Sequence, residues 1–61
     1  MAEETILIVD DEPAIREMIA TTLELADFRV LEAENAQQAH QRVVDERPDL
    51  ILLDWMLPGV S

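Results

Sequence analysis

Three short apolar runs and two stretches with helical periodicity account for most of the chain. The apolar runs are residues 5–9, 28–33 and 50–54. The first is continuous and rich in β-branched residues, which at this length favours a strand buried on both faces, as in parallel sheets. The second carries Arg29 and Glu32, whose charges indicate a strand at the edge of a sheet.

Residues 13–26 and 36–46 have the spacing of amphipathic helices. Pro13 fits a first helical turn, because its missing N–H costs nothing there. Asn35 can cap the second helix, and Gln38 three residues later gives the spacing of a capping box. The apolar positions predicted to face a sheet are Ile15, Met18, Ile19, Thr22, Leu23 and Ala26 in the first helix, and Ala36, Ala39, His40, Val43 and Val44 in the second.

The resulting order of elements is strand, helix, strand, helix, strand. Alternation with short connections predicts an α/β fold, with parallel strands joined by right-handed crossovers. The whole chain therefore reads as one half of a doubly wound sheet. A chain of 61 residues buries only about 60% of its unfolded surface, so its core is small. The absence of cysteine excludes disulfides and thiolate zinc sites.

The charge balance narrows the possible partners. The sequence has fourteen acidic residues, four arginines and no lysine, which gives a net charge of −10. Such a surface repels nucleic-acid phosphates and anionic lipids, so we expect this chain not to bind DNA or membranes directly. No apolar run is long enough to span a membrane, and the acidic N-terminus does not resemble a signal peptide. We therefore expect a cytoplasmic protein.

An acidic triplet, Asp10-Asp11-Glu12, follows the first predicted strand directly. One interpretation is purely structural, since acidic residues near a helix N-terminus each contribute about 0.3–1 kcal/mol. Asp54, at the end of the third run, favours a functional interpretation. The carboxyl ends of parallel strands lie along one edge of the sheet, where ligands bind. If the first and third strands are neighbours, Asp10, Asp11 and Asp54 meet there.

Three carboxylates brought together repel one another unless a cation lies between them. Because the candidate ligands are all carboxylate oxygens, Mg²⁺ or Mn²⁺ is expected rather than zinc. A carboxylate beside such an ion can attack phosphorus and form an acyl phosphate. Asp54 is the candidate nucleophile, because it stands alone at a strand end whereas Asp10 and Asp11 are adjacent.

Three segments, ILIVDDEPAIREMI, LEAENAQQA and RPDLILLDWMLPG, resemble the receiver domains of bacterial response regulators. Within that family they are most similar to the PhoB-like transcription regulators of the phosphate regulon. The resemblance covers nearly the whole chain. It implies a flavodoxin-like (CheY-like) doubly wound sheet, present here as a βαβαβ half with strand order 2-1-3.

The resemblance also implies a role for each site residue. Asp54 would be the phosphoacceptor, and Asp11, Asp54 and the backbone carbonyl of Met56 would bind Mg²⁺. Asp10 would act on the ion largely through a bound water. The implied phosphodonor is a phosphohistidine on a sensor histidine kinase. The implied output is control of transcription through a C-terminal DNA-binding domain, and the chain itself is expected not to be an enzyme.

Other features of the family have no counterpart in this sequence. Receivers use a Ser/Thr after the fourth strand and a lysine after the fifth, whereas this chain has no lysine and Ser61 does not match the switch position. We therefore expect residues 1–61 to be the N-terminal half of a receiver. The apolar edge of the third strand should then favour self-association, most simply as a homodimer.

Two other functions compete with the receiver interpretation. The first is a fold fragment that self-associates and has no phosphotransfer activity. The second is a phosphatase-class enzyme with an aspartate nucleophile. This class requires D-x-D, whereas Asp54 is followed by Trp55 and Met56.

Overall fold

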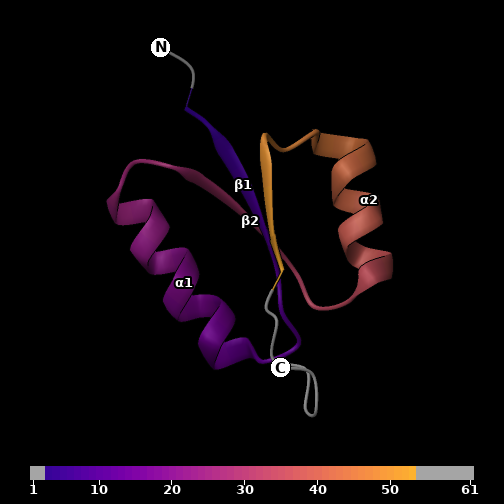
Figure 1. Cartoon of the computed structure of the whole chain (residues 1–61), viewed down its shortest axis with the longest axis horizontal. Coiled ribbons are helices and arrows are strands. Elements are labelled where there is room, and N and C mark those ends of the chain that lie inside the picture. The colour runs from indigo at the N-terminus through magenta and orange to yellow at the C-terminus, as the bar shows by residue number, and fades with distance from the viewer. Residues whose placement is uncertain (1–2, 54–61) are drawn as a thin grey trace.

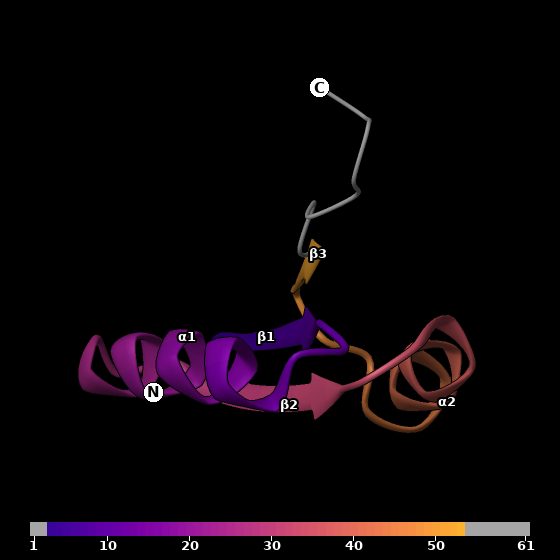
Figure 2. The same ribbon diagram turned by 90° about the horizontal axis from the view of Figure 1, so that it is seen from below.

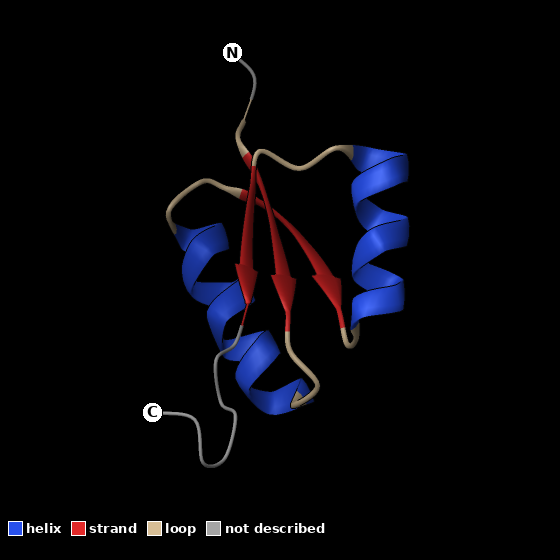
Figure 3. Cartoon of the chain, turned by 45° about the vertical axis from the view of Figure 1, so that its right-hand side comes forward, coloured by secondary structure: helices blue, strands red, loops and turns tan. Residues whose placement is uncertain are grey.

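A computed structural model describes residues 3–53, which form three strands and two helices. In chain order the elements are β1 (Thr5–Val9), α1 (Pro13–Leu25), β2 (Arg29–Ala33), α2 (Ala36–Glu46) and β3 (Leu50–Leu53). The strands are parallel and lie in the order β2-β1-β3. Their carboxyl ends share one end of the sheet (Figure 3). The predicted α/β fold, a βαβαβ half of a doubly wound sheet with order 2-1-3, is confirmed.

The two helices lie on opposite sides of the sheet (Figure 1). β1 is the central strand, and Ile6, Leu7 and Ile8 are almost fully buried. Leu7 packs in a cluster with Leu31 and Ala33 of β2, and Ala39 of α2 packs against this cluster. Because side chains alternate along a strand, Ile6 and Ile8 face the other side, toward α1. The core therefore consists of two thin layers, one on each face of β1.

The junction between α1 and β2 differs from the predicted ranges 13–26 and 28–33 by one residue on each side. α1 ends at Leu25 and β2 begins at Arg29, so neither Ala26 nor Phe28 belongs to these elements. The N–H of Phe28 donates to a carbonyl of the last turn of α1 at 3.1 Å, which removes this donor from the sheet. Asp27, with φ of 71°, takes the left-handed position that glycine usually fills at a helix end.

The start of α2 confirms the predicted cap. The Oδ1 of Asn35 accepts a hydrogen bond from the N–H of Gln38 at 2.8 Å. The side chain of Gln38 reaches back to the N–H of Glu34 at 3.0 Å, one residue before the position that a capping box would use. Two backbone donors at the helix start are satisfied in this way.

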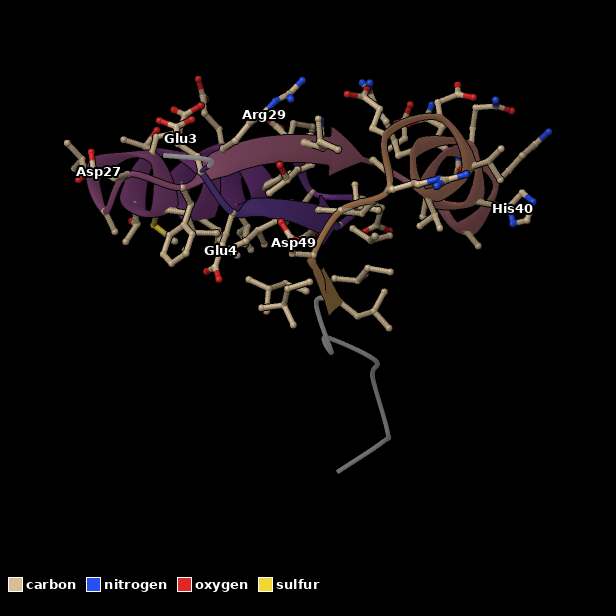
Figure 4. All side chains as sticks on the ribbon, turned by 90° about the horizontal axis from the view of Figure 1, so that it is seen from above. Glu3, Glu4, Asp27, Arg29, His40 and Asp49 are labelled. Carbon is tan, nitrogen blue, oxygen red and sulfur yellow. The ribbon has the colours of Figure 1, made fainter. Side chains whose placement is uncertain are left out.

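The predicted apolar faces of the helices are only partly correct. In α1, Ala20 is buried, whereas Met18 is 62% exposed. In α2, Ala39 packs against the core. His40 is exposed and points away from the sheet (Figure 4), so its predicted packing position is wrong. The physical reason is that the described sheet is narrow. Each helix packs only against β1 and β2, so some of the apolar positions predicted for each helix have no strand to cover them.

β3 stands apart from both helices (Figure 2). Within residues 3–53 it packs only against β1, and neither helix contacts it. All four of its residues are exposed, from 37% at Leu52 to 57% at Leu53. The sequence predicted a strand over 50–54 with an open outer edge. The structure has the strand over Leu50–Leu53, and Asp54 lies outside the described residues.

Candidate functional site

The acidic pair lies at the carboxyl end of β1, where the chain leaves the sheet toward α1. The N–H of Asp10 donates to the carbonyl of Ala33 at 3.0 Å, so the pairing of β1 with β2 extends one residue beyond the strand. Asp10 is only 3% exposed, whereas Asp11 is exposed. The structure thus gives the two predicted metal ligands different surroundings, one inside the fold and one facing solvent.

The carboxylate of Asp10 has one satisfied and one unsatisfied oxygen. Oδ1 accepts a hydrogen bond from the N–H of Glu12 at 2.8 Å, which supports the chain just before Pro13 begins α1. Oδ2 is buried and has no hydrogen-bond partner among residues 3–53. A buried charged oxygen without a partner is costly. Asp10 and Asp11 are adjacent in the chain, and carboxylate oxygens are the ligands that Mg²⁺ and Mn²⁺ prefer.

Arg16, on the first turns of α1, also reaches this site. Its guanidinium donates to the main-chain carbonyl of Asp10 at 2.8 Å, and its Nε lies 2.9 Å from Oε1 of Glu32 in β2. The sequence analysis assigned no role to Arg16. The available signal was its position in the first turn of α1, directly after the acidic triplet, from which a long side chain can reach back to the strand end.

The remaining predicted site residues, Asp54 and the Met56 carbonyl, lie outside the described residues. β3 is described up to Leu53, which pairs with Val9, the residue before Asp10. Among residues 3–53, no three acidic or histidine side chains come together as a metal site. The predicted set of ligands is therefore described only at Asp10 and Asp11, and the complete site stays a prediction.

Comparison with known families decides the classification. Residues 6–61 match the family model described as the response regulator receiver domain. The chain belongs to this family. The match spans almost all of this receiver chain, including the acidic pair after β1 and the segment that follows β3, so the resemblance predicted from sequence is confirmed.

Curated relatives agree with this classification. The phosphate regulon transcriptional regulatory protein PhoB of Pseudomonas aeruginosa is 69% identical over the whole receiver chain, which spans 27% of that relative. PhoB of Escherichia coli is 52% identical over 92% of the receiver chain and 24% of the relative. The sporulation initiation phosphotransferase F of Bacillus subtilis is 42% identical over the whole receiver chain and 49% of the relative. The receiver chain thus spans about a quarter of the PhoB proteins.

No solved structure matches the receiver chain significantly. Of the helices that the structure describes, none has both the length and the apolar character to cross a membrane. The relatives named above are regulators or a phosphotransferase, and they give no support to the fold-fragment alternative.

Proposed function

We propose that this receiver chain accepts a phosphoryl group on Asp54 in the presence of a divalent cation. The observation that carries the proposal is the Asp10 carboxylate, which is 3% exposed at the end of the central strand and has a buried Oδ2 without a partner among the described residues. A fold tolerates such an oxygen at little cost when a cation occupies the space beside it.

Chain geometry supports a place for Asp54 at the same edge. Val9 and Leu53 are paired across β1 and β3, and the next residues in the two chains are Asp10 and Asp54. In sequence, Asp10 and Asp54 each follow directly on the last residue of their strand. This supports the proposal that the two carboxylates share a cation.

Asp11, Asp54 and the backbone carbonyl of Met56 would hold Mg²⁺, and Asp10 would contact it largely through water. Mn²⁺ has the same preference for oxygen ligands. When bound, the ion neutralises charge on the oxygens of the phosphoryl group during transfer. The residues of the chain contribute orientation: Asp10 is fixed by backbone hydrogen bonds, and Asp11 faces solvent, from which a phosphodonor would approach.

The proposed transfer step is a displacement at phosphorus. A carboxylate oxygen of Asp54 attacks the phosphorus of a phosphohistidine on a sensor histidine kinase. The new P–O bond forms as the P–N bond breaks, and the imidazole leaves with the bonding electron pair and takes up a proton. In this reaction the sensor histidine kinase is the donor and the chain is the acceptor, which takes up one phosphoryl group per chain.

The reaction can be tested with acetyl phosphate as a small phosphodonor. With Mg²⁺ present, we expect intact-mass spectrometry to show one added phosphoryl group on the chain, and no addition when EDTA removes the ion. Asp54→Asn should abolish the addition, whereas Asp49→Asn, at the other end of β3, should leave it intact. Equal labelling of the Asp54→Asn variant, or labelling that persists in EDTA, would overturn the proposal.

Control of transcription is proposed from the similarity to relatives that are longer than this chain. Because the chain spans about a quarter of PhoB, control of transcription is proposed only for a protein that also carries a DNA-binding domain. The net charge of −10 argues that the receiver chain itself does not contact DNA. The absence of cysteine fits a cytoplasmic protein that meets a sensor histidine kinase there.

Self-association through β3 is a second proposal, carried by a separate observation. Four consecutive apolar residues, Leu50 to Leu53, are exposed, and in residues 3–53 no strand pairs with their outer edge. Exposed apolar edges of this kind pair readily with another chain. A two-fold dimer that joins two copies of β3 is the simplest arrangement.

A further inference from the structure

Arg16 connects three elements at the acidic end of the sheet: it lies in α1, contacts the residue that follows β1, and pairs with β2. We propose that Arg16 is a positioning residue, which holds Asp10 in the orientation that leaves its Oδ2 free for the cation. The inference rests on the proposed cation-dependent function. It concerns a residue that is not among the proposed cation ligands and is not the proposed phosphoacceptor.

Asp10 has four polar groups, and three of them are fixed. Its N–H donates to Ala33 at 3.0 Å, its carbonyl accepts from Arg16 at 2.8 Å, and its Oδ1 accepts from Glu12 at 2.8 Å. Within the described part of the chain, only Oδ2 is left without a partner. The bond from Arg16 is the one that ties Asp10 to a side chain rather than to the backbone, so a single substitution can remove it.

Glu32 holds the guanidinium of Arg16 in place. The Nε of Arg16 lies 2.9 Å from Oε1 of Glu32, and the side chain of Arg16 is only 18% exposed. Glu32 is itself anchored, because its carbonyl accepts a hydrogen bond from Nε of Arg42 in α2 at 3.2 Å. A guanidinium with two fixed partners keeps its fork geometry with little loss of entropy per bond, which a lysine cannot reproduce.

Charge and positioning have opposite effects on cation binding at this site. The positive charge of Arg16 lies next to the proposed cation site, so electrostatics alone would make its removal strengthen Mg²⁺ binding. Loss of positioning would instead weaken binding, because the Asp10 carbonyl would lose its side-chain donor. Outer-shell residues that orient ligands typically affect metal affinity by about 10- to 100-fold. The sign of the change therefore separates the two effects.

The test is a Mg²⁺ titration of the chain, followed by the fluorescence of Trp55, which adjoins Asp54 in the sequence. We expect Arg16→Gln to weaken Mg²⁺ binding by about tenfold. Arg16→Lys keeps the charge but cannot hold both partners, and should also weaken binding. Glu32→Ala releases the guanidinium and should have an intermediate effect, while Glu32→Gln, which keeps an acceptor oxygen, should have a smaller one.

Arg29→Gln is the matched control. Arg29 also lies on β2 and forms an ion pair with Glu46 at 3.3 Å, but it is opposite Thr5 at the other end of the sheet. Its substitution should leave the Mg²⁺ affinity unchanged. Circular dichroism identifies variants that do not fold, and if Arg16→Gln is among them, Arg16→Lys and Glu32→Ala carry the test.

The outcomes separate the inference from the function on which it rests. A parent chain that shows no response to Mg²⁺ overturns the proposed cation-dependent function, and this inference with it. A parent chain that binds Mg²⁺, together with folded Arg16 variants that bind equally well or more tightly, overturns the positioning role alone. Weaker binding in both Arg16 variants, with the Arg29 control unchanged, is the expected result.

Discussion

Thr5 and Asp49 are joined by two reciprocal hydrogen bonds. The N–H of Asp49 donates to the carbonyl of Thr5 at 2.8 Å, and the N–H of Thr5 donates to Oδ2 of Asp49 at 2.7 Å. The pair fixes the register of β3 against β1 just before the first paired residues, Ile6 and Leu50. Because a one-residue slip would exchange the two faces of β3, this contact also decides which side chains point to each side.

Asp49→Ala should therefore destabilise the fold. The substitution removes the acceptor for Thr5, and we expect the free energy of unfolding to fall by about 0.5–1.5 kcal/mol, as for other single hydrogen bonds. Urea denaturation followed by circular dichroism measures the change. Asp49→Asn keeps an acceptor oxygen and should recover most of the loss. Equal losses in both variants would contradict the role given to this hydrogen bond.

The left-handed residue at the end of α1 offers a stabilising substitution. Asp27 has φ of 71°, and its N–H and that of Phe28 close the helix on Glu24 and Leu23. Asp27→Gly should raise the free energy of unfolding by up to about 1 kcal/mol, because a side chain is disfavoured in this conformation. Asp27→Ala should not stabilise the fold, since alanine keeps the Cβ. A stabilisation by alanine equal to that by glycine would contradict this explanation.

The cap of α2 gives a prediction of the opposite sign. Asn35→Ala removes the acceptor for the N–H of Gln38 and should cost about 1 kcal/mol. Asn35→Asp preserves that acceptor and adds a charge that the helix N-terminus favours, so it should be close to neutral. Thermal denaturation of the three proteins compares them directly. If alanine were tolerated as well as aspartate, the hydrogen bond would have no measurable role.

The exposed strand β3 predicts how the chain behaves at high concentration. We expect sedimentation velocity to show a dimer at high micromolar concentration, and Leu50→Lys to shift it toward monomer, because a charge on an edge strand opposes pairing. Leu50 is 53% exposed, so the substitution disturbs little packing. Lysine also makes the net charge less negative, which by itself would favour association, so a shift toward monomer in a variant that stays folded by circular dichroism indicates loss of the β3 contact.

Met18→Lys is the control for this experiment. Met18 is 62% exposed on α1, and its substitution makes the same change in charge away from β3. The control should dimerise as the parent does. A folded parent chain that stays monomeric at high micromolar concentration would contradict the self-association proposal.

The sequence was most informative where local chemistry alone decides the structure. The apolar run Thr5–Val9 could be predicted as a strand buried on both faces because neither face carries a charge. Asn35 could be placed as a cap because the amide oxygen needs only a donor three residues away. Features that depend on the neighbours of an element were missed. Met18 has the right spacing for burial, but the sheet beneath α1 is too narrow to cover it.

The candidate site was predictable to a similar extent. The positions of Asp10 and Asp11 followed from the rule that parallel strands end at one edge. Their difference in burial did not, because it depends on how α1 leaves the strand. Arg16 was missed because its role comes from two contacts with other elements, at Asp10 and Glu32, and no local pattern specifies these.

The central position of β1 sets a gradient of local stability across the sheet. β1 is the only described strand paired on both sides, and Ile6 to Ile8 are buried under the two helices. β3 can separate by breaking only its bonds to β1, whereas the β1 amides that donate to β2 are exposed only when β2 also comes away. Amide hydrogen exchange should therefore be slowest in the β1 amides that donate to β2 and fastest in β3. The segment that leads directly to Asp54 is thus the part of the sheet that opens first.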